Sequence, residues 1–321
     1  AIKEYNVGEL SIYWRTKSSN EEHPQIPSYL NFGFSYNEEL QLLTQKLTPE
    51  LMNVLDIVYA QEFNVGYLQE GHDLAESYGG DFIRFVNSCF DIYNISPKRV
   101  LEVGCGGCFL LRQFKEQGLD VIGVDPSPIA MDKAKELEIP FLQGYFPEIS
   151  PEKNVDLIYH INVLEHVPDP VEFLSRQKEK ISEGGWIIVS VPDCTPAIKR
   201  GDLSMVIHQH LSFFDQNSLS NTFSKAGFCV KEVQVSKVGG SLYCLAQNVK
   251  KPSTVNYECT KTWSDFTNHL TVNIDKLKTY LFQFNDNNKS LGVFVPLRGI
   301  PYLSLAKIFS GFRFFEDDRG M

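Results

Sequence analysis

The chain has 321 residues, of which 43% are hydrophobic and 22% are charged, so we expect a well-filled globular core. Its formal net charge of −10 argues against nucleic acid as a partner, because phosphate binding draws on a surplus of Lys and Arg. No apolar stretch is long enough to form a membrane span. The seven cysteines are mostly isolated, as in reduced proteins, and no signal peptide is visible, which together predict a cytoplasmic location.

The first part of the chain is aromatic and polar and shows no regular alternation of strands and helices. Residues 40–59 carry apolar side chains at helical spacing, which predicts one or two helices there. We therefore expect residues 1–73 to form a helical segment that acts as a lid. Tyr67 and His72, at its end, are candidates to cap a bound cofactor, but they suit an ordinary helix surface equally well.

From residue 99 onward, short β-rich runs alternate with helical stretches, a pattern typical of βαβ units and a parallel sheet. Strands are predicted at 99–103, 120–124, 140–142, 155–161 and 186–191, and helices at 109–117, 128–137, 170–181 and 217–226. Two further β-rich runs joined by Gly239 and Gly240 predict an antiparallel hairpin. The expected fold of residues 74–249 is α/β: a Rossmann-like, mostly parallel, seven-stranded sheet that ends in this hairpin.

The chain after Pro252 has a different pattern. Residues 264–284 have helical character, residues 291–295 resemble a strand, and a last helix follows. We therefore expect residues 250–321 to hold a helix and part of an α/β domain.

A glycine-rich turn follows the first strand of the predicted sheet, with the sequence Gly104-Cys105-Gly106-Gly107-Cys108. Such a turn lets a ligand approach the backbone, although a tight turn alone would also explain it. Glu102 lies two residues before the first glycine, where a carboxylate suits a cationic amino-acid group better than a pyrophosphate. Asp125 ends the next strand, where an acid can accept both hydroxyls of a ribose. The missing G-x-G-x-x-G run favours S-adenosylmethionine over NAD.

These residues resemble the first motif of class I methyltransferases, E/D-x-G-x-G-x-G, with Cys108 at the third glycine position. The run Leu164-Glu165-His166-Val167-Pro168-Asp169-Pro170 resembles the fourth-strand motif of the same family and is more specific than the glycines. The resemblance implies that S-adenosylmethionine is bound and S-adenosylhomocysteine is produced. It implies cofactor-binding roles for Glu102, Gly104, Gly106 and Asp125 at methionine and ribose, for Tyr145 and Phe146 at adenine, and for His160 and Ile161 beside methionine.

Cys105 and Cys108 also form a C-x-x-C pair between a strand and a helix, as in thioredoxin-like redox sites. Such a domain would need neither Asp125 nor the Leu-Glu-His-Val run. A zinc site is disfavoured because no second C-x-x-C or histidine pair supplies further ligands, so we expect no metal. A simpler interpretation is that cysteine is small enough for a crowded turn.

Methyl transfer starts from an activated donor, so the protein aligns donor and acceptor and, where needed, removes a proton. His208 and His210 follow the fifth predicted strand, at the sheet edge where α/β proteins bind ligands. In an extended segment both side chains would face the same way, into the pocket. Either could instead satisfy buried backbone groups. We take His210 and His208 as the candidate catalytic residues, with His210 as the stronger candidate for the base.

The run from His208 to Phe214 resembles the His-Glu-His-Leu-Ser-Tyr-Phe motif of the sugar C-methyltransferase family, which acts on nucleotide-linked keto sugars. Gly239-Gly240-Ser241 resembles a downstream motif of that family, and residues 292–319 resemble the start of its C-terminal α/β domain. The second histidine is taken as the base there, which corresponds to His210. The chain departs from the family at Gln209, which replaces an acid, and it has no counterpart of the four-cysteine zinc module.

The resemblance implies an enzyme that transfers a methyl group from S-adenosylmethionine to a carbon or hydroxyl of a nucleotide-linked sugar or glycan precursor. Two alternatives stay open. One is a methyltransferase for another small polar metabolite, and the other is a module that binds the cofactor without catalysis.

Overall fold

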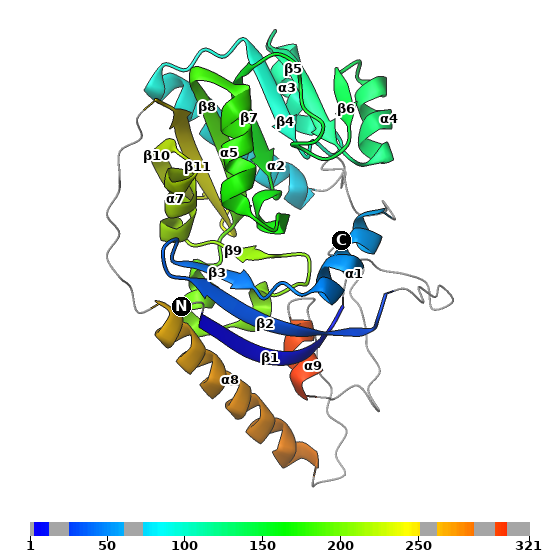
Figure 1. Ribbon diagram of the computed structural model, residues 1–321, viewed down its shortest axis with the longest axis vertical. Coiled ribbons are helices and arrows are strands. Elements are labelled where there is room, and N and C mark those ends of the chain that lie inside the picture. Colours follow the sequence, from blue (N-terminus) through cyan, green and yellow to red (C-terminus); the bar gives the residue numbers. More distant parts are fainter. Residues whose placement is uncertain (1–2, 13–25, 61–72, 251–261, 286–298, 307–321) are drawn as a thin grey trace.

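The computed structural model describes residues 3–12, 26–60, 73–250, 262–285 and 299–306, and every structural statement below concerns these residues. They form two β-sheets, one of seven strands and one of four, with helices packed against both (Figure 1). None of the helices in these ranges is both long and apolar enough to cross a membrane. The expected strand at 291–295, Tyr67 and His72 lie outside the described residues.

The larger sheet has the strand order β10-β11-β8-β7-β4-β5-β6. Its parallel strands are β4 (Arg99–Val103), β5 (Asp120–Asp125), β6 (Phe141–Gln143), β7 (Val155–Ile161) and β8 (Ile181–Pro192). The hairpin of β10 (Phe228–Val235) and β11 (Ser241–Asn248) closes one edge, with β11 antiparallel to β8. The predicted Rossmann-like sheet with its terminal antiparallel hairpin is thereby confirmed.

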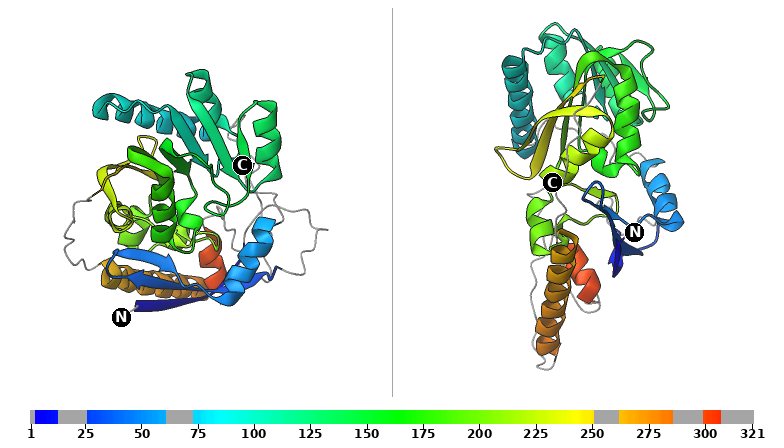
Figure 2. Two further views of the ribbon diagram at one scale, coloured as in Figure 1. Left: turned by 45° about the horizontal axis from the view of Figure 1, so that its top comes forward. Right: turned by 60° about the vertical axis from the view of Figure 1, so that its left-hand side comes forward.

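Both faces of this sheet are covered by helices, so its central strands are apolar along most of their length (Figure 2). Helices α2 (Asp73–Tyr93), α3 (Phe109–Glu116) and α4 (Pro128–Glu136) cover one face. Helices α5 (Pro170–Lys180) and α7 (Gln216–Lys225) cover the other. Val100 and Leu101 on β4 are both fully buried, one against each layer.

The smaller sheet is antiparallel, and it corrects the expectation of a helical N-terminal segment. It consists of β1 (Lys3–Ser11), β2 (Tyr29–Asn37), β3 (Leu42–Gln45) and β9 (Ser212–Phe213). On β2 every second side chain is buried, from Leu30 through Phe32 and Phe34 to Tyr36. This period of two is typical of a strand. The helical spacing that was noted for residues 40–59 gives a helix only from Pro49 onward. Of the one or two helices predicted within residues 40–59, only α1 (Pro49–Ala60) forms.

The described C-terminal elements are helices, and the predicted α/β fragment stays a prediction because its strand at 291–295 lies outside the described residues. Helix α8 (Thr262–Asn285) lies where a helix was predicted, and α9 (Ile300–Ala306) follows. Both pack against the smaller sheet, where the ring of Phe266 lies 5.0 Å from that of Phe34. Within the described ranges this part of the chain adds helices and no strand to the fold. Helix α6 (Thr195–Arg200) and the short 3-10 helices η1 (Leu164–His166) and η2 (Leu203–Met205) complete the described elements.

Candidate active site

A cleft of about 1380 Å³ opens at the carboxyl ends of β4, β5, β7 and β8, the edge at which parallel α/β sheets bind ligands. One wall comes from the turns that follow these strands. The other wall comes from α1 and from the segment between η2 and β9, which carries the two predicted histidines. The cleft therefore lies between the larger and the smaller sheet.

The turn from β4 into α3 has the backbone conformation that glycine favours. Gly104 and Gly106 have φ values of +71° and +47°. A Cβ atom on Gly104 would lie 2.6 Å from Cγ2 of Val163, so a larger residue would collide with the turn between β7 and η1 as well as strain the backbone. The turn lines the cleft with backbone rather than side chains, which allows close approach of a ligand.

Asp125 lies at the end of β5 and is 2% exposed, with its carboxylate at the tip of this turn. Its Oδ2 accepts a hydrogen bond from the amide of Gly106 at 2.9 Å, and its Oδ1 accepts one from the amide of Ser127 at 2.8 Å. Burial raises the pKa of Asp125, and the two amide hydrogen bonds oppose that shift. Each oxygen retains a second lone pair that a ligand hydroxyl in the cleft can use.

Glu102 is 5% exposed and lines the same cleft as Asp125. Its Oε2 accepts a hydrogen bond from the hydroxyl of Tyr159 at 2.8 Å. Burial raises the pKa of Glu102 well above its usual value, and the Tyr159 hydroxyl partly offsets this. A positively charged ligand group beside Glu102 would favour the ionised carboxylate. The structure thus brings together the two acids that the sequence singled out.

The remaining candidate cofactor residues divide into two groups. Tyr145, Phe146 and Ile161 line the cleft. His160 does not: it is fully buried, and its ring lies 5.9 Å from that of Phe173 on α5. The expectation that the His160 side chain lies beside methionine is therefore wrong, because the alternation of side chains on β7 turns it into the core.

His210 lines the cleft and is half-buried, in a segment held by hydrogen bonds to η1. The amide of Leu211 donates to the carbonyl oxygen of Glu165 at 2.7 Å, and Nδ1 of His166 lies 2.9 Å from the carbonyl oxygen of Gln209. The rings of His166 and His210 are 5.0 Å apart. A side chain that can accept a proton is thereby placed in the cleft.

His208 is not available for catalysis, contrary to the expectation from its spacing. It is 2% exposed, its Nε2 lies 3.4 Å from the carbonyl oxygen of Leu30, and its ring packs against that of Phe32 at 5.7 Å. Burial is the main cause that lowers the pKa of His208 to about 4. The amide of His210 donates to the carbonyl oxygen of Ile207, so this segment turns and its alternate side chains diverge.

Two residues of the site were missed by sequence reasoning. Glu165, in a motif that was recognised but given no role, is 1% exposed, and neither carboxylate oxygen has a hydrogen-bond partner. Burial raises the pKa of Glu165 to about 8. With its amide oriented to satisfy both groups, the Gln45 side chain on β3 donates to the carbonyl oxygens of His208 and His210 at 3.1 and 3.0 Å. No local pattern could have indicated that contact.

Part of the chain is similar to known proteins. Residues 74–233 match the family model described as a methyltransferase domain. Residues 74–233 form a class I S-adenosylmethionine-dependent methyltransferase domain. The match covers the glycine turn, Asp125, η1 and His210, and it leaves out β1 to β3, α8 and α9.

Relatives of this methyltransferase domain include two ubiquinone biosynthesis O-methyltransferases. The protein from Azorhizobium caulinodans is 34% identical over 99 residues, which cover 29% of this chain and 39% of that protein. The protein from Pseudomonas fluorescens is 28% identical over 167 residues, which cover 46% of this chain and 72% of that protein. The chain spans 39% to 45% of the length of the first three curated relatives that it matches.

Among solved structures, the 1,6-didemethyltoxoflavin-N1-methyltransferase of Burkholderia thailandensis, with bound 1,6-didemethyltoxoflavin and S-adenosylhomocysteine, is 17% identical to this chain. The TM-score is 0.47, and the likeness covers 65% of this chain and 96% of that one.

The two cysteines of the glycine turn are thiols in this methyltransferase domain. The Sγ atoms of Cys105 and Cys108 lie 3.9 Å apart, and both residues are buried. Cys105 packs under β5, where a Cβ atom on Gly123 would lie 2.7 Å from its sulfur. A small side chain is needed at this crowded place, which explains Cys105 without redox chemistry.

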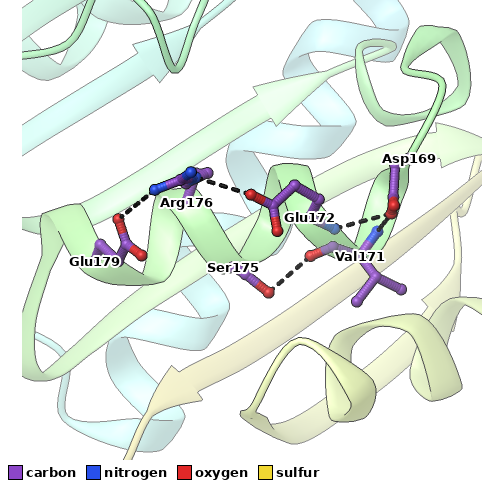
Figure 3. A network of polar contacts seen from close by, with 6 residues as sticks. All are labelled: Asp169, Val171, Glu172, Ser175, Arg176 and Glu179. Carbon is purple, nitrogen blue, oxygen red and sulfur yellow. Dashed lines mark hydrogen bonds and ion pairs between the residues drawn. The ribbon is translucent and has the colours of Figure 1, made fainter.

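The described lining of the cleft is rich in acids. The carboxylates are those of Asp56, Glu102, Asp125, Glu148, Asp169, Glu172 and Asp193. Within the described part of the chain, Arg176 is the one Lys or Arg side chain that lines the cleft, and it pairs with two acids on α5 (Figure 3). Its Nε lies 2.9 Å from Glu172 and its Nη1 lies 3.5 Å from Glu179. The methyltransferase cleft therefore suits a positively charged ligand such as a sulfonium compound.

Proposed function

We propose that this chain is an enzyme that transfers the methyl group of S-adenosylmethionine to a small polar acceptor, with His210 as the general base. The observation that carries the proposal is that His210 opens into the same cleft as Asp125 and Glu102. A cofactor held by the two acids and an acceptor beside the histidine would share one cleft. A direct displacement between donor and acceptor requires that proximity.

The residues on the cofactor side would bind and orient S-adenosylmethionine. Asp125, already fixed by two backbone amides, would accept the ribose hydroxyls, and Glu102 would face the ammonium group of the methionine part. Tyr145, which is 53% exposed, and Phe146 would flank the adenine. The bound cofactor supplies a methyl group on a positively charged sulfur. The positive charge makes this sulfur a good leaving group.

The residue on the acceptor side moves a proton. The cofactor would supply its methyl carbon to the acceptor atom and would keep the electron pair of the carbon–sulfur bond on sulfur. The proton lost by the acceptor passes to His210, whose backbone is fixed through Gln45 and Leu211. His208 has no part in this step, because it is buried against β2.

For the acceptor we propose a sugar ring, carried on a nucleotide or a glycan precursor. The proposal is supported by the resemblance of His208 to Phe214 and of Gly239 to Ser241 to sugar C-methyltransferases. Hydroxyl, amide and carboxylate groups that suit a sugar line the cleft at Asp193, Ser204, Gln209 and Ser241. The acidic lining implies that the sugar ring, rather than an attached diphosphate, lies within this part of the cleft.

A phenolic hydroxyl of a prenylated aromatic ring is the second candidate acceptor. It is favoured by the curated relatives, which are named ubiquinone biosynthesis O-methyltransferases. Helix α1 adds the apolar side chains of Met52, Leu55 and Val58 to the cleft wall, which would suit an isoprenoid tail. The same base would serve a phenol.

The acceptor is tested by transfer of a labelled methyl group, read by NMR. The acceptors tested are nucleotide-linked keto and hydroxy sugars, the same sugars without the nucleotide, and catechols as phenolic acceptors. Label on a sugar carbon or hydroxyl supports the sugar proposal, and label on catechols alone contradicts it. Calorimetry with S-adenosylmethionine and with NAD tests the wider proposal, which fails if NAD binds and S-adenosylmethionine does not.

The base is tested with His210→Asn. We expect the variant to retain its affinity for S-adenosylmethionine and to lose turnover ~10²-fold or more, as is typical when a general base is removed. The matched control is His269→Asn, which changes an exposed histidine on α8 that bonds the carbonyl oxygen of Lys199. Unchanged turnover in His210→Asn would exclude His210 as the base.

A further inference from the structure

Glu165, His166 and His210 form a cluster at the acceptor end of the cleft that the proposed reaction does not fully use. Each offers one ligand atom, and these three atoms lie within 4.8 Å of one another. Glu165 and His166 come from η1, and His210 comes from the segment bonded to it. Glu165 is 1% exposed, and neither of its oxygens has a hydrogen-bond partner. A buried carboxylate in that condition needs a positive partner.

The hydrogen bond of His166 determines which of its nitrogens carries a proton. Nδ1 lies 2.9 Å from the carbonyl oxygen of Gln209, and a carbonyl oxygen can only accept. Nδ1 is therefore the donor, and in the neutral ring Nε2 presents a lone pair. The Nε2 atom lies 3.7 Å from Oε1 of Glu165. When Glu165 is ionised, two electron-rich atoms therefore face each other, and a cation between them would satisfy both.

We propose that Glu165, His166 and His210 bind one zinc ion or a similar divalent transition metal. Two imidazoles and one carboxylate are a ligand set that zinc accepts, whereas magnesium prefers oxygen ligands. The contact from Nδ1 of His166 to a backbone carbonyl is the second-shell bond that orients metal-binding histidines. Ligand atoms around a tetrahedral zinc lie roughly 3.3 Å apart, so small side-chain movements would complete the site. A fourth position is left for water or a ligand.

The spacing of the three ligands along the chain explains why no metal site was predicted from the sequence. Glu165 and His166 are neighbours, and the third ligand follows more than forty residues later, so no metal-binding spacing is visible. The contacts of η1 with the segment before β9 bring them together.

The consequence for catalysis rests on the proposed role of His210 as the base. One lone pair cannot bind a metal and accept a proton from the acceptor at the same time. We therefore expect zinc to inhibit methyl transfer, and a chelator to restore it. The site would make turnover sensitive to divalent transition metals.

The site is tested by titrating tag-free full-length protein, stripped with a chelator, with Zn²⁺ alone in a calorimeter. Co²⁺ replaces Zn²⁺ in a parallel absorbance titration, because tetrahedral nitrogen and oxygen ligation gives visible bands. We expect one ion per chain and ~10²-fold or greater loss of affinity in Glu165→Gln and in His210→Asn. His269→Asn should bind as the wild type does. Circular dichroism checks the fold, and the half-buried His210 keeps the test usable if the Glu165 variant unfolds.

The outcomes separate this proposal from the proposed function. No stoichiometric binding, or binding that both variants retain, would overturn the site. Binding lost in Cys108→Ser would do the same, because it would place the ion at the thiols of the glycine turn. Zinc binding at these ligands that leaves turnover unchanged would support the metal site and contradict His210 as the base. Because the titration contains no cofactor or acceptor, a failed methyl transfer assay does not affect it.

Discussion

The cofactor end and the acceptor end of the cleft are built in different ways. At the cofactor end, the turn after β4 and Asp125 after β5 belong to adjacent parallel strands, and the bond from Gly106 to Asp125 spans 19 positions. At the acceptor end, Gln45, Glu165 and His210 come from three distant segments that meet through backbone carbonyls. The first arrangement follows from a short motif. The second depends on how the smaller sheet packs on the larger domain.

The largest expected effect is at the cofactor end. Asp125→Asn should lower the affinity for S-adenosylmethionine by about 100-fold, because charge-assisted hydrogen bonds contribute about 1.5–3 kcal/mol each and two would be lost or weakened. Calorimetric titration measures the change. The control is Asp120→Asn at the other end of β5, where the exposed carboxylate pairs with Arg99. A loss smaller than about threefold in Asp125→Asn would show that the ribose is held elsewhere.

The contrast between the two ends also explains what could be predicted from sequence. The seven strands and the hairpin follow from local periodicity, and Glu102 and Asp125 follow from their distance to the glycines. The strand β2 was not predicted, because only the helical spacing after residue 40 was considered and the alternation of Phe32 and Phe34 before it was not. That alternation becomes meaningful only when another strand is present to pair with it.

The histidines of the sequence show the same limit. The i, i+2 rule that placed His208 in the pocket holds for an extended backbone, but the hydrogen bond from the amide of His210 to Ile207 makes a turn. His210 was predicted to line the cleft, and it does. The residue that fixes its backbone, Gln45, was not predicted. Gln45 lies far from it in sequence and carries no motif. Its contact arises from the pairing of β3 with β9.

His160 belongs to neither end of the cleft, and its burial is tested through the pH dependence of stability. Burial lowers the pKa of His160 from 6.5 to about 3, so between these values the unfolded chain binds a proton that the folded chain does not. The free energy of unfolding should therefore fall as the pH drops below about 6.5. The contribution of His160 to the loss between pH 7 and pH 5 is about 2 kcal/mol.

Urea unfolding of the wild type and of His160→Leu at pH 7 and pH 5 measures this contribution. The variant should lose less stability across that interval and should bind S-adenosylmethionine as the wild type does at pH 7. An equal loss in both proteins would mean that His160 titrates normally. A change in the affinity for S-adenosylmethionine would show that His160 contributes to cofactor binding.

The acceptor end is tested through Gln45. Gln45→Leu removes two hydrogen bonds to the carbonyl oxygens of His208 and His210, each worth about 1 kcal/mol. The segment that carries the base should then be less well positioned, and turnover should fall about tenfold while the affinity for S-adenosylmethionine is retained. Gln247→Ala, which removes an exposed amide bonded to Gly184, is the control. Equal losses of turnover and cofactor affinity would show that the two ends are not separate.

The smallest expected effect lies on α5, which follows η1 directly and so connects the two ends. Oδ1 of Asp169 accepts hydrogen bonds from the amides of Val171 and Glu172 at 3.0 and 2.9 Å, an N-cap that Figure 3 shows beside the ion pairs of Arg176. Asp169→Ala should lower the free energy of unfolding by ~1 kcal/mol in urea. Arg176→Ala should leave it unchanged within error, because exposed ion pairs are screened by solvent. If the two variants were equally destabilised, the exposed ion pairs would stabilise α5 as much as the backbone cap does.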